Sequence, residues 1–334
     1  MPNIAFNAAE IGSLAERAAY HADELLAAGV RDSGAHGLLL ALRWTDHLDA
    51  AERVTEQWTE IARRQGSEEA FAAARIHSAH LNGMRGRLRQ AEADAETATA
   101  AAPQGSVNFV IACVALTDCL INQGDLGAAQ AAYDAIGFGE RIPPFPPYGG
   151  VRGIRAELCC ALGQHAATLA DYEELTGRSA GRRSGANIAV ILAAIESHHA
   201  LVHQDVVKTE LDQAVTLAQQ WGTPSAIGSV MRVRGRLAGD PAQAIEDLRT
   251  AIEYLQRSPR RLVHARALVD LGSALRRAGR RTDAREPLRA GYELARECGA
   301  DGLAETARLE LSASGVRLRR ERLTGAESLT ASER

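Results

Sequence analysis

The stretch that decides the fold is residues 261–300, RLVHARALVDLGSALRRAGRRTDAREPLRAGYELARECGA. Its apolar residues recur at helical spacing on both sides of a short break. They are Ala267, Leu268, Leu271 and Leu275 before the break and Ala284, Leu288 and Leu294 after it. This spacing predicts two amphipathic helices. Within the break, Gly279 can take the left-handed conformation that ends a helix. Thr282 or Asp283 can cap the helix that follows.

Two further residues support a helical hairpin of roughly 40 residues, the usual size of such repeats. Pro287 falls in the first turn or so of the second predicted helix, where a missing N–H is tolerated. Gly272 has no side chain, so another helix can approach closely there. One hairpin cannot bury both apolar stripes alone, and we therefore expect copies of it on either side.

The chain contains these copies. A short turn followed by a small residue recurs at Gly86, Gly124, Gly163, Gly239 and Gly279, with glycine-free members near Thr45 and His203. Successive turns lie about 36–41 residues apart, which is the range of helical-repeat proteins. No sustained strand alternation is present. The sequence predicts an all-α, right-handed α-solenoid of about seven to eight helical hairpins over residues 1–313.

A Pro-rich stretch at residues 137–150 interrupts the repeats, since prolines favour an extended path over a helix. We expect an ordered inter-repeat loop, with a lid or a docking ledge as the alternative. Phe138, Phe145 and Tyr148 are expected to pack on the solenoid. Residues 314–334 are basic and then polar, and are predicted to form a linker.

Composition narrows the class of protein. The chain has 334 residues and a formal net charge of −4, with a sequence pI of about 6.2, so it has no global basic footprint for nucleic acid. The N-terminus lacks the features of a signal peptide, and the most apolar run, residues 188–195, is too short to span a bilayer. We expect a cytoplasmic protein without a membrane partner. The five cysteines, with no CxxC pair, are interpreted as reduced thiols. They are Cys113, Cys119, Cys159, Cys160 and Cys298.

Catalytic motifs are missing from the chain. No GxxxxGK[ST], GxGxxG, GxSxG or HExxH occurs, so we predict no catalytic residue, no cofactor and no metal. Glu196, His199 and His203 could share a helix face and bind a metal. A metal-dependent enzyme is therefore kept as a third hypothesis. With no fourth ligand indicated, a polar helix edge is the preferred interpretation.

A solenoid offers a concave wall built from the first helix of each hairpin. Side chains that lie off the packing stripe of that helix are candidates to face this groove. In the stretch quoted first they are Arg266, Val269, Ser273 and Arg276, and the same offset in the third repeat gives Asp118 and Asn122. A protein, a peptide or a small-molecule effector is the expected partner. The alternative is that these are only exposed helix positions.

The repeats resemble the tetratricopeptide pattern, and three longer phrases carry a sharper resemblance. The phrases are ALRWTDHLDAAERVTEQWTEIARRQGS, GRLRQAEADAETA and SPRRLVHARALVDLGSALRRAGRRTDAREPLRAGYELARECGADGLAETARLELSASGVRLRR. In this order they resemble the central and C-terminal helical region of large ATP-binding LuxR-family (LAL-type) transcriptional regulators of actinobacteria. The final LTGAESLTASER looks like the linker into that family's helix-turn-helix domain.

The resemblance implies an effector-sensing or protein-interaction region that gates transcription. No Walker A motif precedes the repeats and the helix-turn-helix itself is absent, so ATP hydrolysis and DNA binding are assigned to no residue here. DNA would be contacted only through that absent domain, and a homo-oligomer is possible. The alternative is a free-standing scaffold or adaptor that binds a peptide or partner protein.

Overall fold

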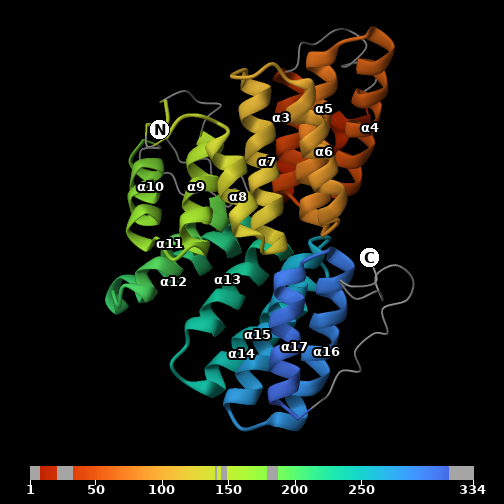
Figure 1. The fold of residues 1–334 in the computed structure, drawn as a ribbon. Coiled ribbons are helices and arrows are strands. Elements are labelled where there is room, and N and C mark those ends of the chain that lie inside the picture. The colour runs from red at the N-terminus through yellow and green to blue at the C-terminus, as the bar shows by residue number, and fades with distance from the viewer. Residues whose placement is uncertain (1–7, 21–32, 140, 144–148, 179–186, 316–334) are drawn as a thin grey trace, which may run out of the picture.

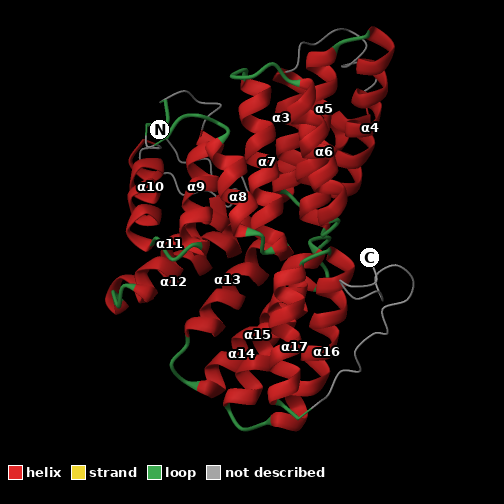
Figure 2. Ribbon diagram, viewed as in Figure 1, coloured by secondary structure: helices red, strands yellow, loops and turns green. Residues whose placement is uncertain are grey.

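The structure is a computed structural model that describes residues 8–20, 33–139, 141–143, 149–178 and 187–315. Within these ranges all regular secondary structure is helical (Figure 2). The helices are α1 (Ala8–Tyr20), α3 (Ser33–Trp44), α4 (Leu48–Gln65), α5 (Glu68–Arg85), α6 (Leu88–Ala101), α7 (Val107–Gln123), α8 (Leu126–Asp134), α9 (Gly149–Ala161), α10 (His165–Arg178), α11 (Ile188–Ala200), α12 (Gln204–Trp221), α13 (Pro224–Leu237), α14 (Pro241–Leu255), α15 (Arg261–Arg277), α16 (Arg281–Cys298) and α17 (Asp301–Ala313).

The helices pair into seven consecutive hairpins, from α3–α4 to α15–α16, and α17 follows as the first helix of an eighth. From α5 onward, the first helix of each hairpin contacts the first helix of the next, which builds one continuous inner layer. The second helices cover this layer from outside (Figure 1). The predicted all-α solenoid of tetratricopeptide-like hairpins is confirmed.

The turns inside the hairpins share one backbone conformation. A left-handed residue occupies the turn at Asp46, Gly86, Gly124, Gly163, Val202 and Gly279. The predicted glycine turns at four of these positions are therefore confirmed. Where glycine is missing, Asp46 (φ 62°) and Val202 (φ 63°) take the same conformation despite their side chains. The turn at Gly239 is the exception, because no positive φ occurs there.

The hairpin α15–α16 matches the prediction in outline and departs from it in two details. A Cβ on Gly272 would lie 2.3 Å from Leu288 Cγ, so the close helix approach is confirmed. Pro287, however, lies well inside α16 and not in its first turn, because the helix already begins at Arg281. Neither Thr282 nor Asp283 caps the helix. Asp283 instead accepts a hydrogen bond from Arg280 Nε at 2.8 Å.

The solenoid winds back onto itself. Helix α5 contacts α15, and α7 contacts α17, so the lower ends of the orange and yellow helices meet the blue ones in Figure 1. A Cβ on Gly86 would lie 2.5 Å from Cys298 Sγ, and one on Gly124 would lie 3.0 Å from the Cα of Gly302. The second hairpin thus packs on the seventh and the third on the eighth. One superhelical turn takes five hairpins.

The Pro-rich stretch packs on the solenoid where it is described. Ile142 is buried in the apolar cluster of α7, α8 and α9, and Phe138 packs against it. Phe145 and Tyr148 lie outside the described residues, as does nearly all of the predicted linker 314–334.

All five cysteines are free thiols, and Cys160 alone is partly exposed. Among the described residues, no helix is both long and apolar enough to cross a membrane.

Candidate binding site on the inner surface

The inner surface, formed by the sides of α3, α5, α7, α9, α11, α13 and α15 that face the superhelix interior, carries a row of acidic residues. Asp118, Glu157 and Glu196 each lie six residues before the left-handed residue of their hairpin, and 39 residues separate one from the next. Because α7, α9 and α11 are neighbours, the three carboxylates occupy equivalent places on adjacent helices.

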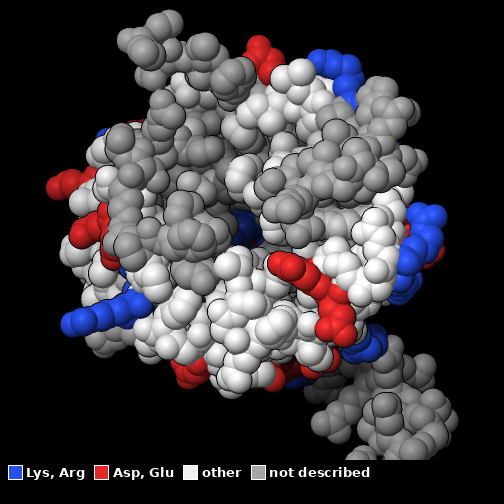
Figure 3. All heavy atoms as spheres, turned by 90° about the horizontal axis from the view of Figure 1, so that it is seen from above, with Lys and Arg blue, Asp and Glu red and all other residues white. Residues whose placement is uncertain are grey.

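Arginines from the second half of the chain face this row. Arg266 on α15 donates from Nη2 to Asn122 Oδ1 on α7 at 2.8 Å, across 144 residues of sequence. Asn122 in turn donates from Nδ2 to Asp118 Oδ1 at 2.9 Å. The structure therefore brings together three of the residues that the sequence assigned to the groove. Viewed from above, the described surface is hollowed near its centre, and atoms of basic side chains lie at the bottom (Figure 3).

Two carboxyl groups of the row have displaced pKa values. Burial raises the pKa of Asp118, against the opposing effects of the Arg266 charge and the Asn122 hydrogen bond. Burial, and then the Asp118 charge, raise the pKa of Glu157 to about 8. Glu157 forms no hydrogen bond or ion pair with any residue in the described ranges. At neutral pH its carboxyl group is therefore largely protonated.

The remaining predicted groove residues, Val269, Arg276 and Ser273, do not share one environment. Val269 is 2 % exposed and packs against α16, where a Cβ on Gly291 would approach its Cγ2 to 2.7 Å; its assignment to the groove is wrong. Val269 is buried because α15 packs against several helices, so the buried stripe of α15 is wider than one row. Arg276 pairs with Glu310 on α17, the next helix of the inner layer. Ser273 is half-buried at the position equivalent to Glu157.

The sequence reasoning missed Arg43 at the end of α3. This side chain is 5 % exposed, and burial followed by the Arg260 charge lowers its pKa to about 10. Its Nη1 lies 3.3 Å from His77 Nδ1, whereas its Nε has no partner among the described residues. No local pattern indicates Arg43. The 39-residue spacing from Asp118 to Glu157 and from Glu157 to Glu196 is the sequence signal that indicates Glu157.

Three histidines, His36, His77 and His80, lie on α3 and α5, and His77 is 3 % exposed. His36 contacts His77 ring to ring, and His80 Nδ1 lies 2.9 Å from the carbonyl oxygen of Ile76. Burial and the nearby Arg43 charge lower the pKa of His80 to about 3 and that of His77 well below its usual range. Both rings are therefore neutral at physiological pH.

A polar contact that we call the closure junction joins the first hairpin to the second half of the chain. Asp46 Oδ1 accepts from Arg260 Nε at 2.9 Å and from Ser225 Oγ at 2.8 Å, and Oδ2 accepts from the Ser225 backbone N–H at 3.1 Å. Trp221 Nε1 donates to the carbonyl oxygen of Trp44 at 3.1 Å. The junction fixes the five-hairpin turn and so fixes the inner surface.

The residues of the metal hypothesis do not converge. Helix α11 ends at Ala200, so His203 lies beyond it and contacts His198 at 3.1 Å. Glu196 accepts from Arg236 Nη1 at 3.0 Å. Across the described part of the chain, no group of three His, Cys, Asp or Glu side chains is placed to hold a metal ion.

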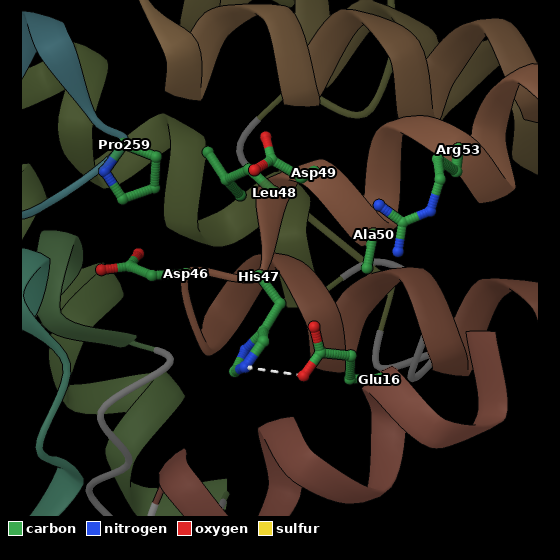
Figure 4. Close-up of a pocket in the computed structure, with 8 residues that line it drawn as sticks. All are labelled: Glu16, Asp46, His47, Leu48, Asp49, Ala50, Arg53 and Pro259. Carbon is green, nitrogen blue, oxygen red and sulfur yellow. Dashed lines mark ion pairs between the residues drawn. The ribbon is translucent and has the colours of Figure 1, made fainter. Parts of the chain in front are cut away.

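A second hollow lies beside the closure junction and shares Asp46 with it (Figure 4). It has a volume of about 280 Å³ and is lined by Glu16, Asp46, His47, Leu48, Asp49, Ala50, Arg53 and Pro259. His47 Nε2 lies 3.9 Å from Glu16 Oε2 across it. Ligand pockets are mostly apolar with a few placed polar groups, and this open, mainly polar hollow does not fit that description. The inner surface is the better candidate site.

Repeating hairpins, a shared left-handed turn and a continuous inner layer define a tetratricopeptide-like solenoid. No family model matches the chain, and neither does any curated protein. The solved structure of a Rap protein complexed with Competence and Sporulation Factor is similar, with a TM-score of 0.67 and 15 % sequence identity. The similarity covers 88 % of this chain and 84 % of that one, and it is a similarity of fold.

Proposed function

We propose that the chain is a non-catalytic binding module that holds a peptide or a segment of a partner protein on its inner surface. The observation that carries this proposal is the set of ionisable groups gathered there from distant parts of the chain, with Glu157 and the Nε of Arg43 left unpaired. Arg43 Nε is buried without a partner among the described residues, and buried polar groups in folded proteins normally have partners. Glu157 is only partly buried, so its carboxyl group stays open to a ligand on the inner surface.

The fold supports the same role. Solenoids of this kind present an extended concave surface on which a peptide lies across several repeats. The similar solved structure is a complex, with Competence and Sporulation Factor bound to a Rap protein.

A second part of the proposal concerns the kind of protein to which this binding module belongs. The sequence phrases quoted above favour the sensing region of a LuxR-family regulator, in which the bound ligand gates transcription through other domains. A free-standing scaffold is the alternative. The reading frame on both sides of this coding sequence distinguishes the two, because the regulator requires a nucleotide-binding module before it and a helix-turn-helix after it.

Thermal unfolding with pools of random synthetic hexapeptides tests the binding role, because a ligand that binds only the folded state raises the melting temperature. Ser273→Trp fills the inner surface, whereas Thr216→Trp places the same side chain at an exposed position on α12. We expect the pools to raise the melting temperature of the wild type and of Thr216→Trp but not of Ser273→Trp. No shift for the wild type, or an equal shift for Ser273→Trp, would contradict the proposal.

A further inference from the structure

The turn of the fifth hairpin holds a strained residue where most other turns use glycine. Val202 has a φ of 63°, and a positive φ is a genuine outlier for a β-branched side chain. Glycine occupies the equivalent position in the second, third, fourth and seventh hairpins. Residues held in sparsely populated backbone conformations tend to cluster at functional sites. The strain at Val202 therefore draws attention to the side chains that this turn positions.

The strained turn brings two histidine rings together. His203 follows Val202 directly, and its backbone N–H donates to the carbonyl oxygen of His198 at 2.9 Å. The Nδ1 atoms of the two rings lie 3.1 Å apart, and the ring centroids lie 5.4 Å apart. His203 is exposed and His198 is partly exposed, so the pair lies at the surface of the molecule.

The spacing of the two Nδ1 atoms suits two ligands of one metal ion. Histidine nitrogens bind zinc at about 2.0–2.1 Å, so two of them on one tetrahedral ion lie about 3.3 Å apart. The observed 3.1 Å is close to this value. A structural zinc site has four ligands, and among the described residues no third His, Cys, Asp or Glu is placed to join this pair. One chain therefore supplies half of a site.

Exposed apolar side chains surround the histidine pair. Leu201, Val202 and Val206 are all exposed, and Leu162 is exposed at the equivalent place before the turn of the neighbouring fourth hairpin. In the first three hairpins the next superhelical turn packs on this end of the repeat, whereas the fifth turn lies at the outer edge of the molecule (Figure 1). An apolar surface around half of a metal site fits a second copy of the chain, because a two-fold axis sets the same surface against itself.

We propose that a divalent transition-metal ion, of which zinc is the best fit, bridges two copies of this chain at the fifth turn. His198 and His203 of each copy supply their Nδ1 atoms, so that four imidazole nitrogens surround the ion. The exposed leucines and valines beside the histidines pack against the same residues of the other copy. This inference goes beyond the proposed function and does not depend on it, because the inner surface takes no part in the bridge.

Sedimentation velocity of the full-length protein tests the bridge. The protein is freed of metal with a chelator and measured without metal, with one zinc ion for every two chains, and with zinc followed by excess chelator. The same series is measured for His198→Gln and His203→Gln. His264→Gln, which removes a histidine from α15, is the matched control. Circular dichroism confirms that each variant is folded, and mass spectrometry of the isolated dimer gives its metal content.

We expect the wild type and His264→Gln to be monomeric without zinc, to form a dimer that holds one zinc ion, and to return to the monomer with chelator. Each site variant should raise the dissociation constant of the zinc-bound dimer at least tenfold. Val206→Asp, which keeps both histidines, should do the same, whereas Thr216→Asp at an exposed position further along α12 should not.

A wild-type chain that stays monomeric with zinc overturns the inference. A dimer that forms equally well without zinc, or equally well in His203→Gln, also overturns it. The zinc and chelator series uses the wild type alone, so a misfolded variant does not remove the test.

Discussion

The turns of the first and fifth hairpins have the same backbone and opposite surroundings. Asp46 and Val202 both hold a positive φ that side chains disfavour. The carboxylate of Asp46 is 7 % exposed and binds Arg260 and Ser225, whereas Val202 is 73 % exposed. At the first turn, the hydrogen bonds of Asp46 with Arg260 and Ser225 offset the backbone strain. At the fifth turn, Val202 is exposed, and no contact from a described residue offsets the strain.

Among the substitutions, the largest loss of stability is expected when Asp46, the acceptor of the closure junction, is replaced. Asp46→Ala leaves Arg260 and two Ser225 donors without their partner, and breaking a largely buried pair in this way costs about 3 kcal/mol. Asp46→Asn keeps an oxygen acceptor and tolerates the left-handed turn, so it should lose roughly half as much. Urea unfolding measures both variants. A change below about 0.5 kcal/mol for Asp46→Ala would mean that the junction does not fasten the superhelix.

Acid should destabilise the second hairpin, which carries His77 and His80 and packs on the seventh, more than the fifth hairpin with its exposed turn. The pKa values of His77 and His80 are lowered in the folded state, so their contribution to stability is complete above the unfolded pKa of about 6.5 and is lost as the pH falls below it. Between pH 7 and 5 we expect the free energy of unfolding to fall by about 4 kcal/mol, about 2 kcal/mol for each histidine. His80→Gln should remove about half of this dependence, because it removes one of the two histidines.

Thr216→Gln, at an exposed position on α12, is the control variant and should keep the acid dependence of the wild type. Equal pH dependence in His80→Gln and the wild type would show that burial of the inner histidines does not govern acid stability.

Alanine substitutions at Gly86 and Gly163 separate two destabilising effects, which are a steric clash with a covering helix and backbone strain. Gly86 and Gly163 have φ values of 74° and 75°, so alanine pays about 1 kcal/mol of backbone strain at either position. At Gly86 the new Cβ would also meet Cys298 Sγ at 2.5 Å, whereas nothing lies within 4 Å at Gly163. Gly86→Ala should therefore be the less stable by about 2 kcal/mol through overpacking. Equal losses in thermal unfolding would contradict the five-hairpin packing.

The sequence predicted the hairpins well because their signals are local. Gly124 and Gly163 mark turns, and apolar spacing marks the buried stripe of each helix. The packing of one superhelical turn on the next was not predictable from such local signals. A repeat length sets the contact between neighbours, but the contact of Gly124 with Gly302 depends on small rotations summed over five hairpins.

For the site too, residues placed by the pattern of one helix were predictable, and residues placed by contacts between distant hairpins were not. Asp118, Asn122 and Arg266 were each placed off the stripe of their own helix, and the structure joins them across the interior. Val269 failed because the helix buries more of its circumference than one stripe. Arg43 has its role only after the superhelix brings Arg260 to it, which no pattern within one repeat indicates.

The smallest predicted effect is a gain in stability, and it concerns Val202 in the exposed turn of the fifth hairpin. Val202→Gly removes a β-branched side chain from a left-handed position, which relieves about 1–2 kcal/mol, while glycine adds about 0.5–1 kcal/mol of backbone entropy loss on folding. Because the valine is 73 % exposed, little burial is lost, and the net result should be a gain of about 0.5–1 kcal/mol in the free energy of unfolding. Leu201→Ala, beside it at a negative φ, should give no gain. If Val202→Gly instead destabilises the protein by as much as Asp46→Ala, the fifth turn is covered in solution, and the contrast between the two turns disappears.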